Sequence, residues 1–360
     1  MVLRDPPGGD LHPARPAPLR ACRIDGEEGL LSAPRKPGSP PYRAATGVLA
    51  LGAGLLLFLP LAGLDRFFLD ILTVGFLLAA FAGSWDIVGG LAGQVSLGHA
   101  LFFGIATYAC ALLTSLAGWP FPAAAAAALL LCAGAGAAVG ALAARLTGPF
   151  VALFTLALGE LAHEAVLGQT FFSPRGGYSW GGEGGIPVAL PWRDLSPWAS
   201  YYGALAFLLL STGLMLRIAR SERGLFWAAI SGSELTARAS GVDVSRYKTE
   251  AFLIGGLLAG AAGVGFAAHV GRATAADLSL ELSFQAATFA AIGGRGTVAG
   301  PVAAALLLHV LFQGSGLGPA ARVLLYASAL LLVLRFFPSG IAGTLRERAR
   351  ARRMGGGGTP

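Results

Sequence analysis

The sequence predicts an all-α fold, a polytopic bundle of helices that spans a membrane. Of its 360 residues, 55% are hydrophobic and only 12% are charged, which is about half the charged fraction of an ordinary soluble domain. The apolar residues form long blocks rather than amphipathic stripes, and a helix needs about 20 mostly apolar residues to cross the hydrocarbon core. The chain therefore has room for about eight to ten spans, and we take about ten as the prediction.

Ten apolar blocks follow one another along the chain, and each is a predicted span. The eighth and ninth are short, so they either cross fully or form a re-entrant pair, which a bilayer tolerates only where protein buries it. The blocks lie at 46–63, 67–88, 98–117, 121–144, 150–169, 201–219, 249–271, 283–294, 299–314 and 320–337.

The two ends of the chain differ from this apolar part. Residues 1–45 are rich in Pro, Gly and Arg and have little to bury, so they are predicted to form a disordered cytoplasmic tail. Residues 46–340 form the predicted transmembrane domain, and 341–360 form a basic, Gly-rich cytoplasmic tail.

The positive charges predict the orientation of the chain. With the N-terminus inside and the ten spans alternating, 21 of the 26 Lys and Arg residues fall on the inner side. An excess of Lys and Arg marks the cytoplasmic face of a membrane protein, so both termini are predicted to be cytoplasmic. The net charge of +7 has the same explanation, and we expect no nucleic-acid partner.

Two loops are long enough to carry function. The outer loop, at 170–200, mixes Gly, Trp and Pro, whereas the inner loop, at 220–248, is charged and is predicted to be partly helical.

Small residues inside the spans are predicted to be packing features. Lipid provides no hydrophobic drive between helices, so helices associate where small residues let their backbones approach. Two pairs of glycines have the four-residue spacing typical of such contacts, namely Gly136 with Gly140 and Gly256 with Gly260.

The motifs of several enzyme classes are absent or incomplete. The two lysines are Lys36 and Lys248, and neither follows a glycine, so no P-loop can be written and this chain is not expected to bind ATP or Mg²⁺. Glu160 and His163 lack a second Glu-x-x-His pair, and the three cysteines are too far apart to suggest a metal site. Ser179 lies in a G-x-S-x-G motif, but without the preceding strand that a hydrolase needs. We expect no cofactor and no enzymatic activity.

The stretch 89–108 places polar side chains among glycines where two spans meet. These residues are Gln94, Ser96, Gly98 and His99, and a helix is predicted to break there. A broken helix exposes backbone donors and acceptors that can build a polar pathway for a solute. A capped turn at the membrane face is an equally weighted alternative.

The inner loop contains a second distinctive stretch, from Glu234 through Ala237 to Gly241. It predicts a short amphiphilic helix that ends at Gly241, because glycine suits the left-handed position that follows a helix. Such a helix could dock into another protein or could be a solvated part of the loop.

A third stretch surrounds Arg295 with small residues. A Gly-rich turn between two short apolar blocks predicts a re-entrant element or a tight cytoplasmic hairpin. Its residues are Gly293, Gly294, Gly296, Gly300 and Pro301.

Taken together and in this order, these stretches resemble the branched-chain amino acid ABC transporter permeases, in particular the LivM-type subunit. The resemblance covers about 67–345. It is carried by GQVSLGHALFFGIATY, RLTGPFVALFTLALGELA, GLFWAAISGSELTARASGVDVSRYKTEAF, GGRGTVAGPV and FFPSGIAG. The third of these is similar to the coupling loops of ABC permeases.

The resemblance implies a bacterial inner-membrane permease that pairs with a second, LivH-like permease. Two cytoplasmic ATPase subunits would bind ATP and Mg²⁺, and a soluble binding protein would deliver the solute from outside. Residue by residue, it implies that Glu234, Ala237 and Gly241 couple to the ATPases. It implies that Gln94, Ser96, Gly98 and His99 belong to the translocation pathway, and that the third stretch is a structural glycine motif.

Some features depart from the family, and other functions stay open. Gly232 and Ser233 stand where relatives carry more charge, and the outer loop has extra Gly and Trp. A urea-type permease of the same family is the nearest alternative. An ion-coupled secondary transporter would place carboxylates deep in its spans, whereas the acidic residues here border theirs, namely Asp70, Asp86, Glu250 and Glu281. An intramembrane hydrolase would depend on Ser179.

Overall fold

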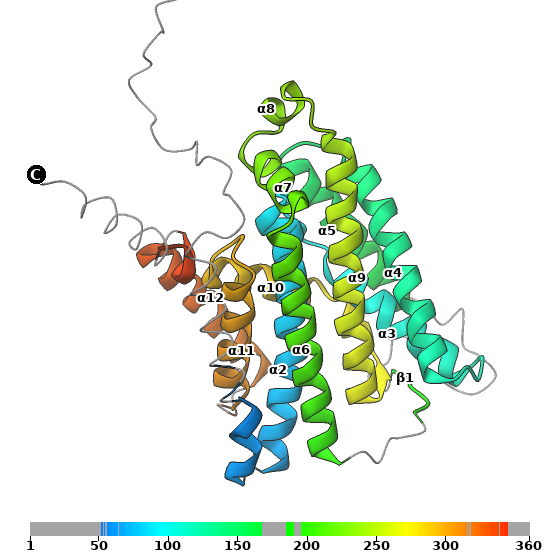
Figure 1. Ribbon diagram of the computed structural model, residues 1–360. Coiled ribbons are helices and arrows are strands. Elements are labelled where there is room, and N and C mark those ends of the chain that lie inside the picture. Colours follow the sequence, from blue (N-terminus) through cyan, green and yellow to red (C-terminus); the bar gives the residue numbers. More distant parts are fainter. Residues whose placement is uncertain are drawn as a thin grey trace, which may run out of the picture. The chain divides into compact units, whose positions relative to one another are not determined.

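The computed structural model describes residues 52, 54, 56–63, 65–167, 185–190, 196–314, 316, 318–337 and 339–344. All of them belong to one of the chain's two units, Pro34–Pro360, and the other unit, Met1–Ala33, lies outside the described residues. The predicted N-terminal tail, residues 46–51, 53 and 55 of the first apolar block, and most of the predicted C-terminal tail also lie outside them. The described part is a bundle of helices (Figure 1), so the predicted all-α class is confirmed.

Five of the described helices are long and apolar enough to cross a membrane. They are α2 (Arg66–Asp86), α4 (Phe121–Ala143), α5 (Pro149–Leu167), α6 (Pro197–Ala219) and α9 (Val244–Val270). Three more apolar helices are shorter, namely α3 (Ala100–Ser115), α11 (Ala299–Gly314) and the stretch Leu324–Val333 of α12. The number of about ten spans stays a prediction.

The other elements are short or connect these helices. They are α7 (Glu222–Gly232), α8 (Glu234–Ala239), α10 (Leu280–Gly293), α12 (Pro319–Phe336), the π-helical turn η2 (Ile87–Leu91), and the 3-10 turns η1 (Leu59–Ala62) and η3 (Ala275–Leu278). The strands β1 (Ile186–Pro187) and β2 (Arg272–Ala273) pair antiparallel.

The described bundle has two distinct ends (Figure 1). At one end, which we name the α8 end, α7 and α8 lie beyond the C-terminal end of α6 and beside the start of α9. At the opposite end, which we name the β1 end, the β-ribbon lies beside the end of α9, and α2 and α6 begin.

Two helices begin earlier than their apolar blocks suggest, because polar side chains cap them. The Ser196 side chain accepts a hydrogen bond from the Ala199 N–H at the start of α6. The Asp243 carboxylate accepts one from the Arg246 N–H at the start of α9, a common way to satisfy the first amides of a helix. The predicted inner loop therefore ends at Asp243, and Lys248 is part of α9.

Helix α9 runs through the middle of the bundle, and glycines let α4 approach it closely. A methyl group added to Gly136 would lie 2.6 Å from the Phe252 carbonyl oxygen of α9. One added to Gly260 would lie 2.6 Å from the Cys132 sulfur of α4. Since such distances leave no room for a side chain, the predicted packing role of these glycine pairs is confirmed.

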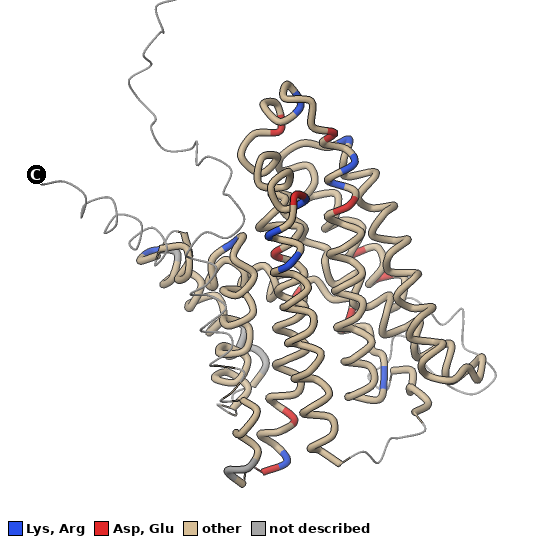
Figure 2. The backbone as a smooth tube through the Cα atoms, viewed as in Figure 1, with Lys and Arg blue, Asp and Glu red and all other residues tan. Residues whose placement is uncertain are grey.

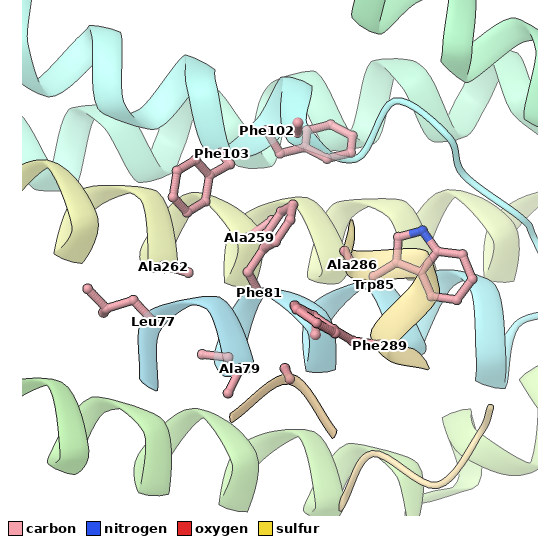
Figure 3. Packing of buried hydrophobic residues seen from close by; sticks show 14 of the residues in the cluster. Leu77, Ala79, Phe81, Trp85, Phe102, Phe103, Ala259, Ala262, Ala286 and Phe289 are labelled. Carbon is pink, nitrogen blue, oxygen red and sulfur yellow. The ribbon is translucent and has the colours of Figure 1, made fainter. Parts of the chain in front are cut away.

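The core of the bundle joins large side chains to small ones (Figure 3). Phe81 of α2 lies near Phe103 of α3, with Ala259 of α9 beside it. The rings of Phe81 and Phe103 are 5.1 Å apart in a T-shaped arrangement, which is a favourable aromatic geometry. Rings from two helices thus fill the space that the alanines of the third leave open.

Candidate functional site

The helix break predicted near residue 94 is present. Helix α2 ends in the π-helical turn η2, and α3 begins only at Ala100. The segment between them, residues 92–99, contains the four predicted pathway residues, and we call it the 92–99 loop. The side chains of Gln94, Ser96 and His99 are all buried in the described bundle, with exposures of 4% or less.

Hydrogen bonds hold the 92–99 loop to three helices. The Trp85 indole N–H of α2 donates to the Ser96 carbonyl oxygen at 2.7 Å. The Leu97 N–H donates to the Thr155 hydroxyl of α5 at 3.0 Å. Just beyond the loop, the Ala100 N–H donates to the Ser283 hydroxyl of α10 at 2.9 Å. The loop and the start of α3 are therefore tied to α2, α5 and α10.

Gly98 is required for the contact of the loop with α5. A methyl group at Gly98 would overlap the Thr155 carbonyl oxygen, and Gly159 of α5 packs directly against the Gly98 backbone. Only glycine lets the loop backbone approach α5 so closely. This close approach is the structural reason for a glycine at position 98.

His99 and Ser96 have polar atoms that are not fully satisfied. His99 shares a 3.0 Å hydrogen bond between its Nε2 and the Ser84 hydroxyl, and its ring lies beside Phe81 and Phe102. Within the described residues, His99 Nδ1 and the Ser96 hydroxyl have no hydrogen-bond partner. Buried polar atoms are nearly always paired, so these two stand out as unused hydrogen-bonding capacity within the described bundle.

The predicted helix of the inner loop is α8. The Ser233 hydroxyl accepts a hydrogen bond from the Thr236 N–H at its start, and Gly241 follows its end with a φ of +84°. This is the left-handed conformation predicted for Gly241.

One face of α8 is turned toward the bundle. Ala237 is buried with Ile230 of α7 and Val244 of α9, and the Glu234 carboxylate also points inward to its partners. On the outer face, Leu235 is 80% exposed. The predicted coupling residues Glu234 and Ala237 thus seat the helix, and Leu235, which the sequence reasoning missed, is its outermost apolar side chain.

The structure brings the two predicted sites together. The Gln94 amide nitrogen donates to the Glu234 Oε1 at 3.2 Å, although the two residues are 140 positions apart. Lys248 of α9 is fully buried, lies 2.6 Å from the same carboxylate oxygen, and also donates to the Leu146 carbonyl oxygen at 3.1 Å.

Sequence reasoning also missed Lys248. The one available signal was its position, because it is one of two lysines in the chain and stands at the edge of an apolar block. A charge there needs a partner, but nothing in the sequence named Glu234.

The Gly-rich turn between α10 and α11 binds a carboxylate of α2. Asp86 is fully buried, and its two oxygens accept from the Gly296 N–H at 2.7 Å and the Val298 N–H at 2.8 Å. The backbones of Gly293 and Gly300 touch, which closes the turn into a tight hairpin. Asp86 was expected only as a carboxylate near a span end, and the structure gives it a capping role.

A cavity of about 570 Å³ opens near the β1 end between α2, α6 and α9. Its walls are mostly apolar, with polar groups from Thr73, Ser200 and His269. None of the predicted pathway residues lines it.

Other sequence motifs have no site around them in the described part. No group of three or more His, Cys, Asp or Glu side chains is placed to hold a metal ion in this part of the chain. Ser179 and most of the predicted outer loop lie outside the described residues.

Comparison with known proteins identifies the family. Residues 67–336 match the profile of the family described as branched-chain amino acid transport system / permease component. The high-affinity branched-chain amino acid transport system permease protein LivM of Escherichia coli (strain K12) is 26% identical over 309 residues, covering 78% of this chain and 71% of that protein. LivM of Salmonella typhimurium (strain LT2) matches to the same extent. No solved structure matches.

The family match extends over most of the chain and includes α2 to α12. It contains the 92–99 loop, α8 and the Gly-rich turn, and every stretch that carries the resemblance except FFPSGIAG, of which only the first residue lies within the match. With the long apolar helices, it makes this a multi-pass protein of the inner membrane. The chain belongs to the family of branched-chain amino acid transport permeases and is of the LivM type.

Proposed function

We propose that this chain is the permease subunit of an ABC importer that moves branched-chain amino acids across the inner membrane. Family membership carries the proposal, since both curated relatives are named for branched-chain amino acid transport. A urea-type permease of the same family is the alternative, but neither relative's name favours it.

In this proposal ATP is bound and hydrolysed by partner subunits. The sequence has no lysine in a P-loop motif, so two ATPase subunits would supply the ATP and Mg²⁺ sites. A LivH-like permease would complete the membrane part, and a substrate-binding protein would dock at the β1 end. This chain itself would perform no chemical step.

The α8 end is the proposed cytoplasmic face. Lys and Arg residues gather toward this end (Figure 2), as the positive-inside rule requires of a cytoplasmic face. Helices α7 and α8 lie there outside the long helices, where a soluble ATPase can reach them. The exposed Leu235 side chain is the proposed apolar anchor, with Gly241 ending the docking helix.

The 92–99 loop is the proposed gate of the translocation pathway. Discontinuous helices present backbone and side-chain polar groups to solutes at membrane depth in other transporters. Here the side chains of Gln94, Ser96 and His99 are buried, and the Gly98 backbone packs against α5. The unpartnered atoms of Ser96 and His99 would meet the solute when the loop moves.

The structure weakens the secondary-transporter alternative. Asp86, one of the carboxylates that could have carried an ion, has both oxygens occupied by backbone N–H groups. Glu250 pairs with Arg223 at 2.9 Å near the α8 end. An ion-gradient mechanism therefore gains no support from these two residues.

Purification from the native membrane in mild detergent tests the proposed function. We expect a second permease and two ATPases to copurify, and we expect the reconstituted complex to take up leucine, isoleucine or valine only with ATP and the binding protein. A chain that purifies alone and transports under an ion gradient would contradict the proposal.

Leu235→Asp tests the docking surface. Because a charge on the anchor opposes burial against a partner, we expect this variant to lose the ATPase subunits on purification while the chain itself still folds. Leu116→Asp is the matched control, since Leu116 is also exposed but follows α3 at the other end of the bundle. Equal loss in both variants would contradict docking at α8.

A further inference from the structure

A buried ion pair lies beneath α8, and the proposed function does not account for it. Lys248 Nζ is 2.6 Å from Glu234 Oε1, and the two side chains are 0% and 23% exposed. Desolvating two charges offsets most of their attraction, so apolar residues would stabilise such a position as well or better. Stability alone is therefore a weak reason for this pair.

Four chain segments meet at this pair. Glu234 is the first residue of α8, and Lys248 stands in the second turn of α9. Lys248 also donates to the Leu146 carbonyl oxygen in the connection between α4 and α5. Gln94 of the 92–99 loop donates to the same Glu234 oxygen that receives Lys248. One carboxylate oxygen thus joins the predicted coupling helix to the predicted gate.

The remaining contacts of α8 are weaker. The helix is six residues long, and its buried face adds one small side chain, Ala237, to a cluster with Ile230 and Val244. Charge-assisted hydrogen bonds are shorter and stronger than neutral ones. A displacement of α8 would therefore reach the interior chiefly through Glu234.

Gln94 is the residue that joins the Glu234 carboxylate to the 92–99 loop. Its own backbone N–H donates to the Val88 carbonyl oxygen at 2.9 Å. This hydrogen bond anchors the backbone of Gln94 beside η2. Four residues later, Gly98 rests against the Thr155 backbone of α5 with no space between them. Because this contact cannot be compressed, a shift at Gln94 must move the loop relative to α5.

We propose that the Lys248–Glu234 ion pair, together with Gln94, transmits movement of α8 to the 92–99 loop. Lys248 is the positioning residue of this link, because it holds the Glu234 carboxylate between α9 and the loop. The inference deepens the proposed function and rests on it, since ATPase subunits acting on α8 would supply the movement.

The Glu234 carboxylate has a second oxygen that could accept the hydrogen bond from Gln94. Glu234 Oε2 is buried and has no hydrogen-bond partner within the described residues. A ligand or partner can shift an equilibrium only if two states differ in their contacts. Transfer of the Gln94 amide from Oε1 to Oε2 would supply such a difference while Lys248 stays in place.

The test is a double-mutant cycle on the complete, reconstituted transporter. Uptake of leucine and ATP hydrolysis are measured in the same proteoliposomes for Lys248→Met, Gln94→Leu and the double variant. Because each single change breaks a hydrogen bond to a charged group, we expect uptake per ATP to fall about tenfold. Since both changes break one link, the double variant should fall about tenfold as well, not about a hundredfold.

Glu250→Gln is the matched control. It breaks another close ion pair between α7 and α9, Arg223 with Glu250 at 2.9 Å, which does not touch the loop. We expect uptake per ATP to stay at the wild-type value in this variant. If Gln94→Leu does not assemble, Gln94→Asn replaces it, because it keeps the amide but is one methylene too short to reach.

The outcomes separate the link from the proposed function. Unchanged uptake per ATP, additive losses, or an equal loss in Glu250→Gln would overturn the link while ATP-driven uptake by the wild type stands. Equal losses of uptake and hydrolysis would show a purely structural role and would overturn it too. No ATP-driven uptake in the wild-type complex would overturn the proposed function itself.

Discussion

At the scale of single residues, Asp86 shows how a buried charge can be structural. Both of its oxygens accept hydrogen bonds from backbone N–H groups, those of Gly296 and Val298, so fixed backbone dipoles help to stabilise the buried charge. Val298 has a φ of +58°, a conformation that costs energy in a β-branched residue. The hydrogen bond from its N–H to Asp86 helps to hold it there.

Asp86→Ala is predicted to destabilise the protein strongly. Two buried N–H groups would lose their acceptor, and each costs about 1–3 kcal/mol when left unsatisfied, so the free energy of unfolding should fall by about 2 kcal/mol or more. Asp86→Asn keeps one acceptor oxygen and should lose less. Thermal unfolding in detergent measures both.

Asp70→Ala is the control for this prediction. The Asp70 side chain is 62% exposed, and surface substitutions of this kind usually change stability by less than about 0.5 kcal/mol. If Asp86→Ala and Asp70→Ala unfold at the same temperature, the capping role of Asp86 is wrong.

Glu234 and Ala237 show that membership of a motif does not tell which way a side chain points. Both belong to the stretch that resembles a coupling loop, and both face the bundle. Leu235 between them faces outward. Because residues on a helix turn by about 100° each, a docking helix needs seating residues and contact residues in alternation.

At the scale of elements, the contact between α4 and α9 depends on which face each glycine occupies. Gly136 lies against the Phe252 backbone, whereas Gly134, two residues earlier on the same helix, has no atom within 4 Å of an added methyl group. The two positions therefore form an internal comparison on one helix.

Gly136→Ala and Gly134→Ala are predicted to have opposite effects. The first must push α4 away from α9 and should cost about 1–3 kcal/mol, as overpacking usually does. The second relieves the entropy cost of a helical glycine and should be neutral or stabilise by up to about 1 kcal/mol. Apparent melting temperatures in detergent decide between them, and equal shifts would refute the close packing.

The short helices α10 and α11 meet the expectation of a paired element. The turn between them is tight, which fits a re-entrant element as well as a cytoplasmic hairpin. Before α10, the Leu278 side chain of η3 lies against Gly104 within α3. The segment between β2 and α10 therefore packs on α3. How much of this pair crosses the bilayer stays a prediction.

At the scale of the whole molecule, the orientation in the membrane is the main prediction. Ser240→Cys at the end of α8 and Ala117→Cys after α3 place small exposed thiols at opposite ends. The native Cys110 and Cys132 are buried, and Cys22 would be replaced by Ser. We expect a membrane-impermeant thiol reagent to label Ser240→Cys only from the cytoplasmic side.

Labelling of Ala117→Cys should occur only from the outer side. This result follows if the Lys and Arg residues near the α8 end mark the cytoplasmic face. Labelling of both positions from one side would contradict the alternation of spans and with it the cytoplasmic termini.

The sequence by itself determined the class, the family and the local turns. Apolar blocks predicted the long helices, the glycines near Gln94 predicted a helix break, and Gly241 predicted a left-handed helix end. These features are readable because hydrophobic length and backbone conformation are encoded within a few consecutive residues.

Only the tertiary structure decided which distant residues meet. Gln94 with Glu234, Lys248 with Leu146, and Asp86 with Gly296 are each separated by more than 100 positions. Apolar helices in lipid have no polar face that reveals their neighbours, so their partners depend on the packing of small residues and on where each buried charge finds a counterpart. For this reason the sequence named the residues of two separate sites, whereas the packed bundle joined them.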